Sequence, residues 1–187
     1  MKTVKYADLL SRPKIKAIMK KLHYREQDLQ IRCVKYFRIQ YPAFARLLFH
    51  PKNEEAGGRE RAAIAKAEGV QAGVADLLLH VQSRYEYRDT QGILTNVSVN
   101  GLAVEMKTKT GRQSESQRTW QRYFEAAGGL YFTVRDFDTF RNVVDEYIAN
   151  IPLAVKERIL DLHHDIEQER NEEARRELQK LISKSSK

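Results

Sequence analysis

Apolar and polar residues alternate with two periods along this chain, which predicts both helices and strands. Apolar residues every three or four positions indicate amphipathic helices, and short apolar runs bounded by turn residues indicate strands. In chain order, the expected elements are a helix at 24–40, a strand at 45–50, a helix at 59–68, a strand at 74–79, a hairpin at 83–100, a strand at 101–107, a helix at 114–127, a strand at 130–134, a helix at 137–148 and a long charged helix from 152. This order predicts an α/β fold in which helices cover a sheet.

The strand at 101–107 carries an acid and a base at alternate positions of an otherwise apolar run. Because side chains alternate between the two faces of a strand, Glu105 and Lys107 are expected on one face and Val104 and Met106 on the other. A charged pair near the end of a buried strand is hard to justify by packing. It suits a site that holds a metal ion and a phosphate.

A second acid, Asp76, interrupts the apolar strand at 74–79. A buried carboxylate without a partner is costly, so Asp76 is expected to meet a metal, a cation or hydrogen-bond donors. The alternative is a residue at the strand edge or in a turn. Neighbouring strands lie ~5 Å apart, so Asp76 and Glu105 can share a cation if their strands are adjacent.

Two helices supply further polar candidates. Glu26 shares one helix face with Gln30, Cys33 and Phe37, and it lies at the edge that should turn inward. The alternative is an exposed first-turn acid that favours the helix dipole. Gln117 lies on the helix that follows the Glu105 strand.

The composition favours an anionic partner. The chain has 187 residues, a net charge of +8 and a pI of about 9.5, which fits one basic domain with a modest extension. Residues 1–23 form a basic arm, which is expected either to contact nucleic acid or to be a solvated terminus. The charges of the last helix balance, so the excess belongs to the rest of the chain.

The sequence also indicates a soluble protein of a reducing, intracellular (cytoplasmic) compartment. The single Cys33 excludes an intramolecular disulfide, and no apolar run approaches the ~20 residues of a membrane span. The N-terminus lacks the apolar segment of a secretory signal. No glycine-rich phosphate loop, zinc spacing or nucleophile elbow is present, and His50 and His80 are expected to be structural or to contact DNA.

Taken together, these residues resemble the motif of the PD-(D/E)XK nuclease superfamily, and the finer pattern is similar to its VRR-NUC branch. The resemblance covers roughly residues 24–140. The matching segments are Glu26-x-x-x-Gln30, the run from Lys66 to Leu79 with Asp76, Val104-Glu105-Met106-Lys107, Ser114-x-x-Gln117-x-x-Trp120 and the strand at 129–134. Glu-X-Lys alone is weak, whereas all five segments in order are specific. Ala75 departs from the pattern, because the family usually has Pro there, and this affects the start of the strand more than the metal ligand.

The resemblance implies a restriction-endonuclease-like α/β fold, with a mixed central sheet flanked by helices and a C-terminal helical extension. The nuclease domain would span 24–150, between the basic arm at 1–23 and a charged helix at 151–187. Stand-alone VRR-NUC proteins resemble junction resolvases and act as homodimers on branched DNA. We therefore expect a homodimer, with the broken apolar stripe of the last helix packing either on the domain or on another chain.

The same resemblance implies a metal site for Mg²⁺ or Mn²⁺. Asp76 and Glu105 would supply hard oxygen ligands, as these ions prefer. The main-chain carbonyl of Met106 commonly completes the shell in this family. Glu26 would hold a second ion or a metal-bound water.

Two other side chains and a basic surface would act on the DNA. Lys107 would orient the attacking water or offset charge in the transition state, and Gln117 would hydrogen-bond that water, Lys107 or the phosphate. Basic groups expected to contact DNA, or else to be merely solvated, are Lys52, Arg59, Lys66, Lys109 and Arg112.

The sequence thus predicts a metal-dependent DNA endonuclease that hydrolyses phosphodiester bonds and is structure-specific on branched DNA, such as four-way junctions or flaps. Two alternatives remain: a non-catalytic DNA-binding accessory protein that retains the fold, and a restriction or defence nuclease with sequence specificity.

Overall fold

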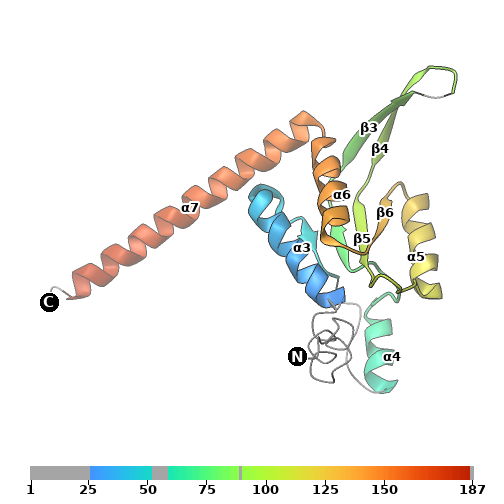
Figure 1. Cartoon of the computed structure of the whole chain (residues 1–187). Helices are drawn as coiled ribbons and strands as arrows, with labels where there is room; N and C mark the ends of the chain where they lie inside the picture. Colours follow the sequence, from blue (N-terminus) through green and yellow to red (C-terminus); the bar gives the residue numbers. More distant parts are fainter. Residues whose placement is uncertain (1–25, 52–58, 89, 186–187) are drawn as a thin grey trace, which may run out of the picture.

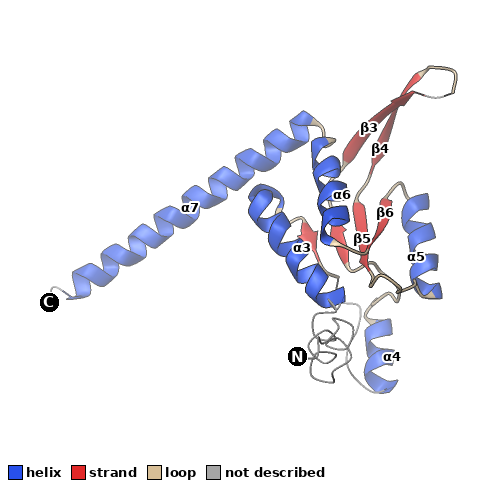
Figure 2. Ribbon diagram, in the orientation of Figure 1, coloured by secondary structure: helices blue, strands red, loops and turns tan. Residues whose placement is uncertain are grey.

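A four-stranded mixed sheet forms the centre of the domain in the computed structural model, which describes residues 26–51, 59–88 and 90–185. Its strand order is β1-β2-β5-β6, and only β5 and β6 run parallel. The strands are β1 (Leu48–Phe49), β2 (Leu77–Leu79), β5 (Leu102–Met106) and β6 (Leu130–Val134). All residues of β5 are buried, so this strand is the middle of the fold (Figure 2).

Helices cover both faces of this sheet (Figure 1). On one face lie α3 (Glu26–Gln40) and α6 (Phe137–Ala149), and on the other lies α5 (Glu115–Ala126). Leu102, Val104 and Met106 point into the main core under α3 and α6, whereas Ala103 packs with Tyr131 on the α5 face. The predicted α/β class, with a mixed sheet between helices, is confirmed.

The remaining elements lie around this core. The 3-10 helix η1 (Pro42–Phe44) leads into β1, and α4 (Arg59–Ala67) lies at the end of the sheet where α3 begins (Figure 1). The strands β3 (Ser83–Arg88) and β4 (Leu94–Val99) form the expected hairpin as a separate two-stranded sheet. No helix among the described residues is long and apolar enough to cross a membrane.

The last helix, α7 (Leu153–Ser185), extends away from the domain (Figure 1). Its first turns pack on the main core through Val155 and Ile159. Further along, Leu178 and Leu181 are 58% and 64% exposed, so this part of the stripe finds no cover within the described chain.

Two expected strands are shorter than the sequence indicated. The strand at 45–50 is reduced to Leu48–Phe49. The strand at 74–79 begins only at Leu77, so Asp76 precedes the strand instead of lying within it. Two features account for the late start: Gly73 adopts a left-handed φ of +84°, and the Asp76 side chain accepts a hydrogen bond from the Met106 N–H of β5. The basic arm at 1–23 and Lys52 lie outside the described residues.

Gly73 also permits a close approach between its loop and the start of α5. A Cβ at this position would overlap the Ser116 carbonyl and the Gln117 amide, whereas a Cβ on Gly92, with a similar φ of +79°, meets nothing within 4 Å.

Gly92→Ala should therefore lower the free energy of unfolding by about 1–2 kcal/mol, from the left-handed φ alone. Gly73→Ala should cost about 2–5 kcal/mol, because overpacking adds about 1–3 kcal/mol. Urea unfolding of both variants tests this, and equal losses would contradict it.

Candidate active site

One cavity lies at the end of the sheet where β5 stops and α3 and α5 begin. Its volume is about 490 Å³. It is lined by Glu26, His50, Ala72, Gly73, Val74, Asp76, Glu105, Lys107, Ser114, Ser116 and Gln117. The five side chains that the sequence proposed as catalytic thus surround one cavity, although they come from four separate segments of the chain.

The pair on β5 is arranged as strand alternation predicts. The Nζ atom of Lys107 donates to Oε1 of Glu105 at 2.6 Å, and both residues are buried, at 8% and 0% exposure. β5 formally ends at Met106, but the backbone N–H of Lys107 still donates to the Val134 carbonyl of β6 at 2.9 Å. This extra ladder bond holds Lys107 on the same face as Glu105.

Gln117 is fixed at both ends of its amide. It forms a capping box with Ser114, in which its Oε1 accepts from the Ser114 N–H at 2.8 Å. Its Nε2 donates to Oε1 of Glu105 at 2.5 Å. The sequence had assigned this amide to a water, Lys107 or the phosphate, whereas in the structure it orients the Glu105 carboxylate.

Tyr131 is a member of the site that the sequence reasoning missed. Its hydroxyl donates to Oε2 of Glu105 at 3.3 Å and accepts from Nε2 of Gln113 at 3.1 Å. In the parallel register Tyr131 pairs with Ala103, and strand alternation places it on the face of Glu105. The sequence shows Tyr131 at an alternate position of the last strand, but this position predicts a contact with Glu105 only once the register of the two strands is known.

Asp76 joins the site from the position directly before the neighbouring strand, β2. β2 and β5 are antiparallel with Leu77 opposite Val104, so the peptide of Met106 lies just beyond the end of β2. There its N–H donates to Oδ2 of Asp76 at 2.7 Å. His50, which the sequence left outside the site, lines the cavity, and its Nδ1 donates to the Asp76 carbonyl at 2.5 Å.

Glu26 reaches the cavity from the first turn of α3. Its Oε1 accepts from the backbone N–H of Thr108 at 2.8 Å, directly after Lys107. The inward-facing alternative for Glu26 therefore describes its position, and the exposed one does not. This hydrogen bond ties the start of the helix to the loop that follows β5.

Burial raises the pKa of both site carboxyls. For Asp76, burial outweighs the Met106 N–H and the charge of Lys107, which lower the pKa. For Glu105, burial again dominates, and the nearby Asp76 charge raises the pKa further, against the hydrogen bond from Lys107. A buried and a half-buried carboxylate with a single lysine leave negative charge that a bound cation would offset.

The oxygen ligands offered by the site suit Mg²⁺ or Mn²⁺, because these ions do not need to be held by protein side chains alone. No group of three or more His, Cys, Asp or Glu among the described residues converges as a ready metal site. Asp76 and Glu105 could therefore supply two hard oxygen ligands, with backbone and water oxygens as the others. Mg²⁺ typically keeps several waters and uses one or two carboxylates.

Three of the basic residues expected to contact DNA have described side chains, and all three are exposed. Lys109 and Arg112 are exposed on the loop between β5 and α5, and Arg135 donates to the Thr108 and Gly111 carbonyls of that loop. Lys66 is exposed in the last turn of α4. Arg59 begins α4, but its side chain is not described, so its role stays a prediction, like those of the others.

Comparison with known proteins supports this architecture. No protein-family model matches the sequence, and no curated protein matches it. Among solved structures, the chain is similar to a protein titled "VRR_NUC domain protein", with 18% identity and a TM-score of 0.53 over 67% of this chain and 89% of that chain. At this identity the likeness establishes the fold. The chain therefore has the fold of a VRR_NUC domain protein, as the resemblance of its motifs implied.

Proposed function

We propose that this protein is a divalent-metal-dependent DNA endonuclease of the PD-(D/E)XK type. One observation carries the proposal: the half-buried Asp76 and the buried Glu105, both with a raised pKa, line a single cavity with Lys107 at the end of two adjacent strands. The VRR_NUC fold and the net charge of +8 support it, because both suit a polyanionic substrate.

The residues divide the work of phosphodiester hydrolysis among them. Asp76 and Glu105 would hold the cation, and the Met106 carbonyl would be a further ligand. When bound, Mg²⁺ or Mn²⁺ polarises the phosphodiester and lowers the pKa of a coordinated water. Lys107 offsets the charge that develops on the phosphate. Glu26 orients water at the edge of the cavity.

The positions of these groups depend on neighbouring hydrogen bonds. Gln117 and Tyr131 hold the two Glu105 oxygens in fixed directions, so Glu105 needs little reorganisation to bind a cation. The Thr108 bond to Glu26 fixes the loop that presents Lys109 and Arg112. These exposed cations would meet DNA phosphates beside the cavity.

Loss of a carboxylate should abolish cleavage without unfolding the protein. Asp76→Asn and Glu105→Gln are each expected to lower the rate of Mg²⁺-dependent cleavage by about 100-fold or more. Asp138→Asn is a matched control, because Asp138 is exposed on α6. The assay compares four-way junctions, flaps and plain duplex, and preference for the branched forms is the expected result.

Other outcomes of this panel select the alternatives. Equal cleavage by wild type and Glu105→Gln would show that the site is wrong. DNA binding without cleavage in Mg²⁺ or Mn²⁺ would select the accessory protein. Discrete fragments from long duplex would select a sequence-specific nuclease.

Metal binding should also change how stability depends on pH. Because the folded pKa of Asp76 is raised, metal-free protein loses stability as pH rises through that pKa, and Asp76→Asn should lessen this loss. Mn²⁺ competes with the proton, so its stabilisation should grow with pH. At 100 times Kd it should reach about 2.7 kcal/mol in wild type and be largely absent in Asp76→Asn. Thermal unfolding in EDTA and in Mn²⁺, from about pH 4, the ordinary pKa of Asp, up to pH 8, measures both, and equal Mn²⁺ effects in the two proteins would count against the metal site.

The exposed stripe of α7 supports a homodimer in this proposal. Leu178 and Leu181 are exposed apolar residues three positions apart on a helix that projects from the domain, and a second copy could cover them. Light scattering should show a dimer at micromolar concentration for wild type and a monomer for Leu178→Glu with Leu181→Glu. A monomeric wild type would rule out this part of the proposal.

A further inference from the structure

A second cavity adjoins the candidate active site, and we propose that it binds an unpaired nucleobase of the DNA strand being cut. This inference rests on the proposed function and names its substrate class, which is DNA with an unpaired nucleotide beside the scissile phosphodiester. It is carried by the shared wall of the two cavities, by an exposed tyrosine ring beside a half-buried tryptophan, and by the charge of the lining.

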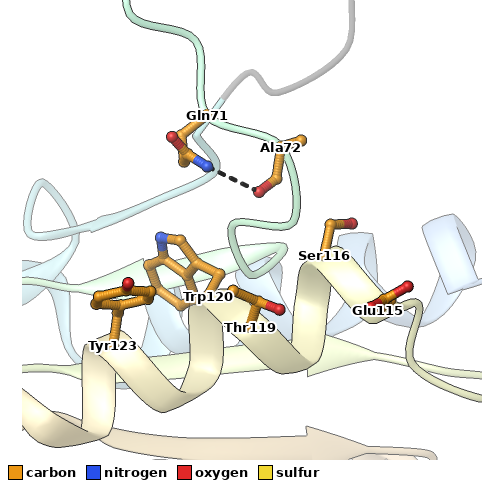
Figure 3. A pocket seen from close by; sticks show the side chains of 7 residues that line it. All are labelled: Gln71, Ala72, Glu115, Ser116, Thr119, Trp120 and Tyr123. Carbon is orange, nitrogen blue, oxygen red and sulfur yellow. Dashed lines mark hydrogen bonds between the residues drawn. The ribbon is translucent and has the colours of Figure 1, made fainter.

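The second cavity lies between the first turns of α5 and the loop before β2 (Figure 3). Its volume is about 620 Å³, within the range of small-molecule sites. It is lined by Gln71, Ala72, Glu115, Ser116, Thr119, Trp120 and Tyr123. Ala72 and Ser116 line the catalytic cavity as well, so one nucleotide can present its phosphate to one cavity and its base to the other.

Aromatic rings give this cavity a surface for stacking. Tyr123 is 75% exposed, although it is a large ring on a helix that packs against the sheet. Trp120 is held in place, because it stacks on Phe124 with ring centroids 4.9 Å apart and lies 6.1 Å from the Tyr131 ring. The packed Trp120 ring therefore loses little conformational freedom on binding, and proteins hold single-stranded bases by stacking them on aromatic side chains.

The polar lining suits a base better than a phosphate. The described residues around the cavity include no Lys or Arg, and the Glu115 carboxylate would repel a phosphate. The Gln71 amide and the Thr119 and Ser116 hydroxyls can both donate to and accept from a base edge. Lys107 lines the neighbouring cavity instead, so the charges direct the phosphate there.

The geometry also sets the pairing state of the base. In a duplex both faces of a base are stacked and its edge is paired, so a base can enter a side cavity only after it leaves the helix. Unstacking costs least where the nucleotide is already unpaired. The second cavity should therefore favour flaps and branch points with an unpaired nucleotide over plain duplex.

The test uses the fluorescence of Trp120, which is the only tryptophan of the chain. Asp76→Asn protein, which should not cleave, is titrated with a flap of unpaired thymidines and with a flap of equal length whose unpaired nucleotides are abasic. The thymidine flap should quench the fluorescence and bind more tightly. Tyr123→Ala should weaken binding of the thymidine flap by about 5- to 150-fold, as loss of a base–aromatic stack does, and should leave the abasic flap unchanged.

Tyr87→Ala is the matched control, because Tyr87 is a half-exposed aromatic residue on β3 in the separate hairpin, and both flaps should bind this variant as they bind the parent. Equal affinity of the parent for the two flaps would overturn the inference, as would an equal loss for both in Tyr123→Ala. The proposed function is tested separately by Glu105-dependent cleavage in wild type. Cleavage without base-dependent quenching rejects only the base site. Base-dependent quenching without cleavage supports the base site and rejects the nuclease.

Discussion

Negative charge buried at the end of β5 is the constraint on which the site depends. Glu105 lies on β5 and Asp76 directly precedes the adjacent strand β2, and burial raises the pKa of each. One buried lysine, a tyrosine hydroxyl, a glutamine amide and a backbone N–H offset this charge only in part. A fold that keeps such a cluster carries a cost in stability, which a bound divalent cation, as proposed above, would offset.

The two faces of the sheet differ in what they carry: one carries most of the apolar core, and the other carries the candidate site. Leu102, Val104 and Met106 point into the large apolar core under α3 and α6, which holds the domain together. The other face carries Glu105 and only a small apolar cluster around Ala103 and Tyr131. α5 has no fully buried residue, so its first turns remain available to line cavities. The site therefore occupies the face whose packing is least demanding.

Hydrogen bonds from the starts of two helices then position the candidate site at the end of β5. Gln117 joins the start of α5 to Glu105, and Glu26 joins the start of α3 to the loop after β5. Gly73 allows the loop before β2 to lie against the start of α5, which brings Asp76 to its place and also forms the wall between the two cavities. The same loop thus positions a carboxylate on one side and supports an aromatic surface on the other.

The sequence by itself determined the order of the elements, the common face of Glu105 and Lys107, and the helix that presents Gln117, because each follows from periodicity within one segment. Only the tertiary structure decided which strands are neighbours, and with it the partners of Glu105. Tyr131 joined the site through the parallel register of β5 and β6, and His50 through the pairing of β1 with β2. Asp76 moved from within a strand to the position before it, because its side chain replaced a backbone acceptor in the ladder. Register and side-chain competition for ladder donors are long-range properties, which no single segment encodes.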